Sequence, residues 1–186
     1  MSIEVIPTRA ALGAEIRGVN LALPLDDATF TAIEDAYNTH GVIFFRDQRL
    51  TPPQQVAFTH RFGEIEFNIF GERWSVPGNP EIVVVSNVTE GGRAVGVRRA
   101  GENWHSDMYY TARPPRGTML YAIEVPELHG LTLGDTEFAN TQAAWEALPD
   151  PLRHRIDGRN GTLQLYRWRA TPVRPARCFP LSFASM

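Results

Sequence analysis

The sequence predicts a mainly β protein with flanking helices. Strand signals outnumber helix signals over its 186 residues, of which 43% are hydrophobic. The predicted strands are short and separated by turn residues, and the helix signals lie mainly in the first third of the chain. This order indicates one ordinary domain built on an antiparallel double sheet with a helical flank.

The first predicted elements are two strands and a helix. Residues 3–6 and 14–18 are apolar or alternating, which predicts short strands. Apolar residues then recur at helical spacing over 28–39, and the aspartate at 26 or 27 precedes them as a candidate N-cap. We therefore expect a helix that ends before Gly41.

Two buried strands and a second helix are expected next. Residues 41–45 and 82–85 are continuous apolar runs, which predict buried strands. Thr51 followed by two prolines starts the helix between them, and Gly63 stops it. A glycine-rich connection follows, with glycines at 91, 92, 96 and 101.

The last predicted elements are a strand and a short helix. Residues 117–125 form another apolar run. Asn140 or Thr141 then caps a helix through Leu148, which Pro149 stops.

Composition excludes several classes of protein. The net charge of −3 does not predict a nucleic-acid surface, and no run approaches the roughly 18 apolar residues of a membrane span. We expect a cytoplasmic protein with no nucleic-acid or membrane partner, and assembly as a homo-oligomer stays open. Because Cys178 is the sole cysteine, any metal must be held by histidine and carboxylate ligands.

The segment 103–110 combines polar, aromatic and histidine residues. In an extended chain, residues i and i+2 point to the same side, so His105 and Asp107 can present a nitrogen and an oxygen to one ion. This donor pair suits iron(II), with a second, distant histidine completing the facial triad of non-haem oxygenases. A structural role for His105 is the alternative, since His-x-Asp alone is a weak motif.

Several ordered blocks resemble the TauD/TfdA dioxygenase family. They read GAEIRGVNL at 13–21, GVIFFRDQRL at 41–50, FTHRFGE at 58–64, WHSD at 104–107, PPRG at 114–117 and GDTEFAN at 134–140. The resemblance covers about residues 3–158. It implies a double-stranded β-helix (jelly roll), iron(II), 2-oxoglutarate as co-substrate, dioxygen and a small anionic substrate such as a sulfonate, an alkyl sulfate or an aryloxy acid.

The resemblance also implies roles for single residues. His105 and Asp107 match metal ligands, and Thr136 matches a residue that helps to hold the far carboxylate of 2-oxoglutarate. Met108 matches a position that lines the substrate pocket. Asn68 falls where taurine-specific enzymes carry a sulfonate-binding histidine, so taurine is not the expected substrate.

The residues after Gly158 look foreign to the domain. Residues 159–186 hold five arginines and no acid, and no histidine follows His154. The prediction is an N-terminal part of a dioxygenase domain over 1–158 and a basic tail over 159–186 that lacks the family's second histidine and provides no barrel strand. A truncation or reading-frame shift explains this ending, and the 186-residue chain by itself is expected to be inactive.

Two other functions remain open. The chain could be a non-catalytic fragment that retains the N-terminal half of the fold. A zinc hydrolase would need a third protein ligand and a catalytic base, which no other motif supplies.

Overall fold

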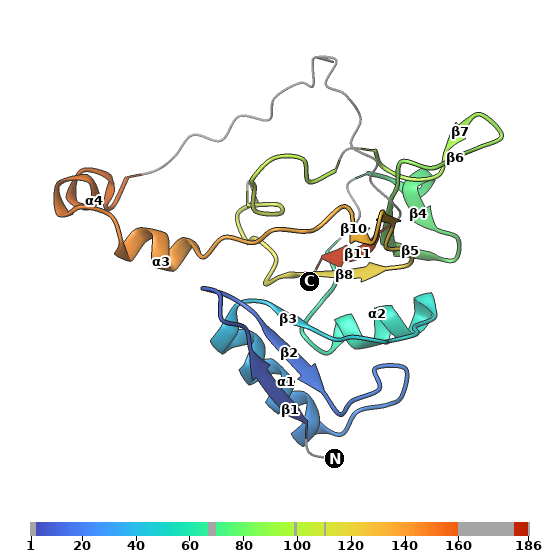
Figure 1. Ribbon diagram of the computed structural model, residues 1–186, viewed down its shortest axis with the longest axis horizontal. Coiled ribbons are helices and arrows are strands. Elements are labelled where there is room, and N and C mark those ends of the chain that lie inside the picture. Colours follow the sequence, from blue (N-terminus) through green and yellow to red (C-terminus); the bar gives the residue numbers. More distant parts are fainter. Residues whose placement is uncertain (1–2, 67–69, 99, 110, 160–180, 186) are drawn as a thin grey trace. The chain divides into compact units, whose positions relative to one another are not determined.

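Strands outnumber helices in the part of the chain that the computed structural model describes, which is residues 3–66, 70–98, 100–109 and 111–159, with the backbone of 181–185 (Figure 1). These residues form eleven β strands, four α helices and one 3-10 helix. The prediction of a mainly β fold with flanking helices is therefore confirmed. The chain divides into two compact units, each taken separately below.

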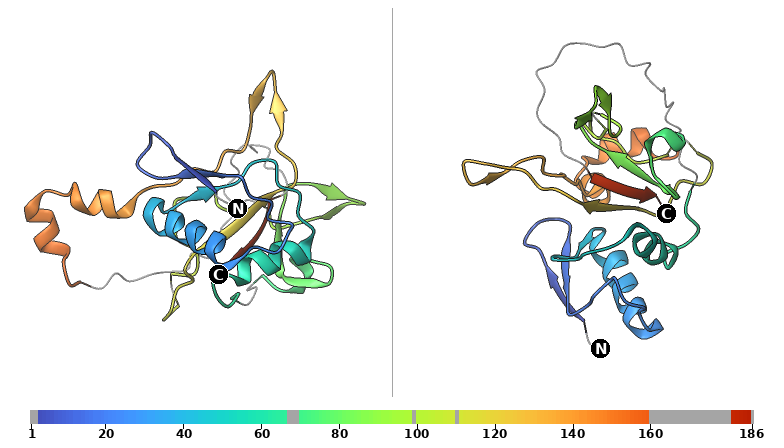
Figure 2. Two further views of the ribbon diagram at one scale, coloured as in Figure 1. Left: turned by 90° about the horizontal axis from the view of Figure 1, so that it is seen from below. Right: turned by 90° about the vertical axis from the view of Figure 1, so that its right-hand side faces the viewer.

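The first unit contains residues 1–19, 31–46 and 137–174. Its sheet has the order β1-β2-β3. β1 (Glu4–Pro7) pairs antiparallel with β2 (Ala14–Arg17), and β3 (Ile43–Phe44) runs parallel to β2. Helix α1 (Asp27–His40) lies along this sheet in both views (Figures 1 and 2). Ile16 and Ile33 are 2% and 0% exposed, so they form the core of this unit.

Helix α1 begins and ends where the sequence predicts. The carboxylate of Asp26 accepts a hydrogen bond of 2.7 Å from the backbone N–H of Thr29, so Asp26 is the N-cap. This bond lowers the pKa of Asp26 because it stabilises the charged form. Gly41 follows the helix with φ = 69°. Its N–H donates a hydrogen bond of 2.8 Å to the carbonyl of Tyr37, which ends the helix.

Two short helices, α3 (Thr141–Glu146) and α4 (Asp150–Ile156), also lie in the first unit. Asn140 caps α3 by accepting a hydrogen bond of 2.9 Å from the N–H of Ala143. Neither helix has a buried residue. The predicted helix through Leu148 is therefore shorter than expected, and α4 was not predicted.

The second unit contains residues 20–30, 47–136 and 175–186. Its antiparallel sheet has the order β4-β5-β11-β8 (Figure 2). The strands are β4 (Ser75–Val76), β5 (Asn79–Val85), β8 (Thr118–Ala122) and β11 (Leu181–Ser185). A 3-10 helix, η1 (Glu72–Trp74), precedes β4.

Helix α2 (Pro52–His60) packs against this sheet. Thr51 and Gln54 form a capping box at its start, as the Thr-Pro-Pro signal predicts for a helix beginning there. Phe58 on α2 and Ile82 on β5 are 7% and 0% exposed, which places the core of the unit between helix and sheet. Phe62 meets Phe58 and Phe30 edge to face, with centroids 5.5 Å and 4.9 Å apart.

Two hairpins stand outside the main sheet. β6 (Thr89–Glu90) pairs with β7 (Arg93–Ala94) around Gly91 and Gly92, and β9 (Glu127–Leu128) pairs with β10 (Leu131–Thr132) around His129 and Gly130. The sequence predicted a glycine-rich connection at the first place and no strand at the second. Two-residue turns with positive φ explain the hairpins, since φ > 0 at both turn residues matches the twist of paired strands.

The tail prediction is wrong for five residues. β11 pairs with both β5 and β8, although the segment 159–186 was expected to provide no strand. Its sequence, LSFAS, alternates large apolar and small residues, which suits a strand. Residues 160–180 lie outside the described part.

No helix among the described residues is both long enough and apolar enough to cross a membrane.

Candidate metal centre

The segment that carries His105 and Asp107 starts from a close contact with β5. Val97 donates to the carbonyl of Val84 at 2.8 Å and accepts from the N–H of Ser86 at 3.1 Å. Gly96 makes this approach feasible, because a Cβ there would lie 2.5 Å from the carbonyl oxygen of Val84. The chain therefore enters the site from a fixed position on the sheet.

His105 is oriented by the backbone of its own segment. Its Nδ1 lies 2.7 Å from the carbonyl oxygen of Asn103. A carbonyl oxygen only accepts, so Nδ1 must carry the proton, and the neutral ring then keeps its lone pair on Nε2. This tautomer presents Nε2 as the donor atom for a metal.

Asp107 is oriented by a neighbouring strand. Its Oδ2 accepts a hydrogen bond of 2.6 Å from the hydroxyl of Thr118 on β8, and its Oδ1 lies 3.0 Å from Nε2 of His105. The two residues that the sequence singled out therefore bring a nitrogen and an oxygen together.

The separation of the two atoms is compatible with a shared metal ion. Two lone pairs that face each other at 3.0 Å repel unless a cation, either a proton or a metal ion, lies between them. Two donor atoms that each bind one ion at about 2.1 Å and at a right angle are about 3.0 Å apart. The separation of Nε2 and Oδ1 fits two neighbouring ligands of an octahedral ion.

The segment reaches this geometry without being a strand. Residues 104–106 are irregular and residues 107–109 form a turn, so the extended conformation that was assumed from His105 to Asp107 does not continue through Asp107. Met108 has φ = 48°, an uncommon backbone for a residue other than glycine. Its carbonyl accepts from both the N–H and the hydroxyl of Thr111 at 2.9 Å, which closes the turn.

The pair is open to solvent. The side chains of His105 and Asp107 are 48% and 36% exposed. Trp104 and Tyr109, on either side in the sequence, are 69% and 47% exposed. An ion here would have room for further ligands.

The other predicted site residues lie in different settings. Met108 adjoins the pair and is half-buried, whereas Thr136 lies in the exposed, irregular segment between β10 and α3. Asn68 lies outside the described residues. The roles of all three stay predictions.

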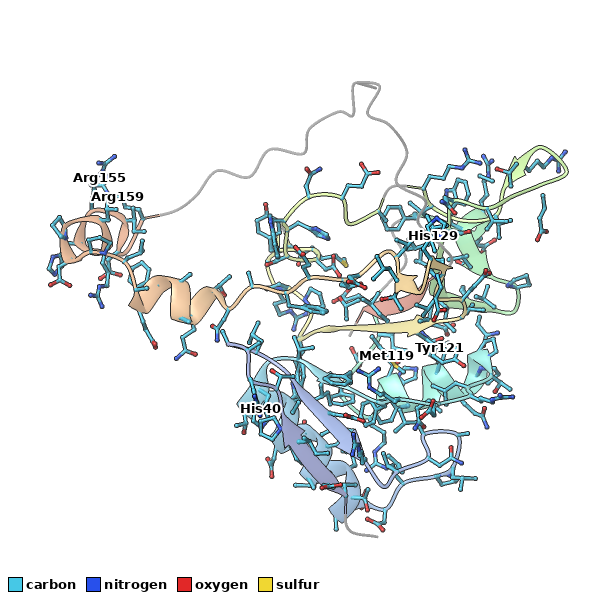
Figure 3. All side chains as sticks on the ribbon, in the orientation of Figure 1. His40, Met119, Tyr121, His129, Arg155 and Arg159 are labelled. Carbon is cyan, nitrogen blue, oxygen red and sulfur yellow. The ribbon has the colours of Figure 1, made fainter. Side chains whose placement is uncertain are left out.

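The other histidines have no visible part in this centre. His40 ends α1 and His129 lies at the tip of the β9-β10 hairpin (Figure 3). His60, His129 and His154 are exposed. In the described part of the chain, no cluster of three or more His, Cys, Asp or Glu residues could hold a metal.

Sequence reasoning missed Asn103 and Thr118. The Asn103 contact is made by its backbone, so its residue type carries no signal. Thr118 is 11 residues from Asp107, and only the alternation of β8 could have indicated it. Met119 and Tyr121 point toward α2 (Figure 3), where Met119 sulfur accepts from Thr59 at 3.1 Å. Alternation then turns Thr118 to the opposite side.

An imidazole and a carboxylate lie two residues apart on a mainly β scaffold. This arrangement places the protein among candidate non-haem metal proteins. Comparison with known proteins narrows this class. The model of the family described as taurine catabolism dioxygenase TauD, TfdA family, matches residues 4–180. This chain belongs to that family. The match runs past residue 158, where the resemblance was expected to end, and the division into a domain part and a foreign tail stays a prediction.

Curated relatives are similar over most of this chain. An alpha-ketoglutarate-dependent sulfate ester dioxygenase from Pseudomonas putida is 34% identical over 158 residues, covering 84% of this chain and 48% of the relative. An alpha-ketoglutarate-dependent 2,4-dichlorophenoxyacetate dioxygenase from Cupriavidus pinatubonensis is 32% identical, covering 85% and 57%. The chain spans about half the length of the relatives it matches.

Solved structures give the same result. A taurine dioxygenase from Burkholderia xenovorans superposes with a TM-score of 0.68 at 34% identity, over 85% of this chain and 52% of that one. The structure of AAD-2 in complex with Mn(II) and N-oxalylglycine gives a TM-score of 0.65 at 27% identity, over 84% and 51%.

Proposed function

We propose that this sequence forms part of an Fe(II)- and 2-oxoglutarate-dependent dioxygenase that oxidises a small anionic organic compound. The observation that carries the proposal is the His105–Asp107 pair, whose Nε2 and Oδ1 lie 3.0 Å apart within a chain of the TauD/TfdA family. The relative AAD-2, crystallised with Mn(II) and an analogue of 2-oxoglutarate, supports both the metal and the co-substrate.

The described residues provide two of the ligands that iron needs. Nε2 of His105 and Oδ1 of Asp107 hold the ion, while the Asn103 carbonyl and the Thr118 hydroxyl orient the two side chains. When bound, iron(II) supplies the open positions and the redox chemistry that a 2-oxo acid and dioxygen require. In this proposal Thr136 contacts the far carboxylate of 2-oxoglutarate.

The proposed substrate class follows from the names of the relatives. Sulfate esters, (S)-phenoxypropionate and 2,4-dichlorophenoxyacetate all join an anionic head group to an organic body. We extend this class to the present protein as a sulfonate, alkyl sulfate or aryloxy acid. Met108 and Asn68 are the proposed substrate contacts.

The complete fold in this proposal is a double-stranded β-helix. The antiparallel sheet β4-β5-β11-β8 and the neighbouring hairpins are consistent with part of such a fold. Because the chain spans about half of its relatives, activity is proposed for the complete domain that carries these residues.

The test is a succinate assay on the complete protein as expressed from its gene, with the 186-residue chain measured in parallel. With Fe(II), 2-oxoglutarate and a panel of the three substrate classes, we expect substrate-dependent succinate from the complete protein. We expect none from the 186-residue chain. Succinate from neither form, while Mn(II) still binds, would instead favour a non-catalytic protein that retains this half of the fold.

A further inference from the structure

We propose that Thr118 is a positioning residue that restricts Asp107 to a single metal-binding oxygen. The inference rests on the proposed metal site. It concerns how the carboxylate is held, which the two-residue His-x-Asp motif leaves undetermined.

The two carboxylate oxygens of Asp107 have different partners. Oδ2 accepts from the Thr118 hydroxyl at 2.6 Å, while Oδ1 faces Nε2 of His105 at 3.0 Å. A distance of 2.6 Å falls in the range of charge-assisted O–H···O⁻ bonds, which are about twice as strong as neutral ones. Oδ2 is thereby occupied, and Oδ1 alone is directed at the ion.

The donor hydroxyl is held on a rigid element. Thr118 lies on β8, which pairs with β11 in the antiparallel sheet. The next residue, Met119, is anchored on the other face by its contact with Thr59 of α2, which is 0% exposed. The hydroxyl is therefore presented from a fixed strand, whereas Asp107 lies in a turn.

An octahedral ion offers only six coordination positions. A carboxylate that binds through both oxygens occupies two of the six positions of an octahedral ion. Three protein ligands, a bidentate 2-oxo acid and dioxygen already require all six. A Thr118 hydroxyl that holds Oδ2 away from the ion therefore keeps one position open for a co-substrate.

His105 is held by the same principle. Its Nδ1 is bonded to the Asn103 carbonyl at 2.7 Å, so only Nε2 is available to the ion. Each ligand thus has one atom committed to the protein and one to the metal. Only the partner of Asp107 is a side chain, so it can be changed by substitution.

The test compares Thr118→Val, which removes the hydroxyl and keeps the shape, with Thr118→Ser, which keeps the hydroxyl. Thr132→Val on the exposed hairpin strand β10 is the matched control. Calorimetric titration of each purified chain with Mn(II) gives the affinity, and the visible spectrum of the Co(II) form reports coordination number. We expect Thr118→Val to bind Mn(II) about 10–100-fold more weakly and to change the Co(II) spectrum. Thr118→Ser and Thr132→Val should match the parent chain.

Unchanged affinity and an unchanged Co(II) spectrum in Thr118→Val would overturn the inference. A ¹³C NMR measurement of the Asp107 carboxyl carbon in metal-free protein detects the hydrogen bond from Thr118 without depending on a bound ion. If the parent chain binds neither ion at millimolar concentration, the His105–Asp107 pair does not hold a metal by itself, and Thr118 is judged on this signal alone. The signal should shift in Thr118→Val and return in Thr118→Ser, and no shift would also overturn the inference. Comparison of the variants' thermal midpoints shows whether Thr118→Val is folded.

Discussion

In the unit built on β1-β2-β3, Ile16 and Ile33 are 2% and 0% exposed, whereas in the second unit the side chains of His105 and Asp107 are 48% and 36% exposed. The first region is held by burial of apolar side chains. The metal pair is instead oriented by hydrogen bonds: Nδ1 of His105 donates to the Asn103 carbonyl, and Asp107 accepts from the Thr118 hydroxyl. Stability and metal binding should therefore respond to different substitutions.

The largest difference between the effect on metal binding and the effect on stability is expected for His105→Ala. Loss of Nε2 leaves one of the two described donors, so Mn(II) binding should fall below detection by calorimetry. Since the side chain is half exposed, the free energy of unfolding should change by no more than about 0.5 kcal/mol. His60→Ala, at another exposed histidine, should keep the parent affinity. Retained Mn(II) binding in His105→Ala would show that the pair is not the metal centre.

The opposite effect is expected for Ile33→Ala. Truncating this fully buried side chain should cost about 2–5 kcal/mol of unfolding free energy, against about 0.5–1.5 kcal/mol for Ile33→Val. Urea denaturation measures both. Folded Ile33→Ala should bind Mn(II) as the parent chain does. A weakened metal affinity there would contradict the separation of scaffold and site.

Gly96→Ala probes the point where the metal-binding segment leaves the sheet. The new Cβ would lie 2.5 Å from the Val84 carbonyl oxygen and 2.9 Å from the Ser86 nitrogen, so the backbone must move. We expect a loss of about 1–3 kcal/mol. The amide of Val97, which donates to Val84, should also lose hydrogen-exchange protection. Parent-like protection at Val97 would show that the contact is not maintained in solution.

The smallest effect is expected from the cap of α1. The hydrogen bond from Thr29 lowers the pKa of Asp26, so the charged carboxylate stabilises the folded state. A depressed folded pKa gives stability that is present above the unfolded pKa and is lost as the pH falls through the folded one. The advantage of the parent chain over Asp26→Asn should therefore shrink as the pH drops from about 5 to about 3.

Urea denaturation at several pH values measures this difference. Asp35→Asn, at an exposed position of the same helix, is the control and should show no such trend. A parent advantage that is independent of pH would mean that the carboxylate charge has no part in the cap.

The regular elements were largely predictable because their signals are local. The aspartate before 28–39 and the glycine after it set both ends of α1, and Thr51 with two prolines set the start of α2. Two elements were not predicted because they lack a local signal: α4 has no buried residue and so no apolar stripe to detect. β11 depends on pairing with β5 and β8, which lie far from it in the sequence.

The site was predictable only as a pair of residue types. The motif indicated His105 and Asp107 for the right chemistry but assumed an extended chain, whereas the structure has an irregular segment and a turn. The hydrogen bonds that orient the two side chains are one to a backbone carbonyl and one from a threonine hydroxyl 11 residues further along the chain. Neither leaves a mark in the sequence near the motif.

The backbone of Met108 determines which residues are favourable at position 108. A left-handed backbone costs an ordinary side chain about 1–2 kcal/mol, and glycine or asparagine adopts it more easily. Random replacement should thus drift toward glycine or asparagine here unless the methionine side chain contributes something in return. Libraries randomised at position 108 would measure that contribution: selection for stability alone should enrich glycine, and selection for turnover in the complete enzyme should restore methionine.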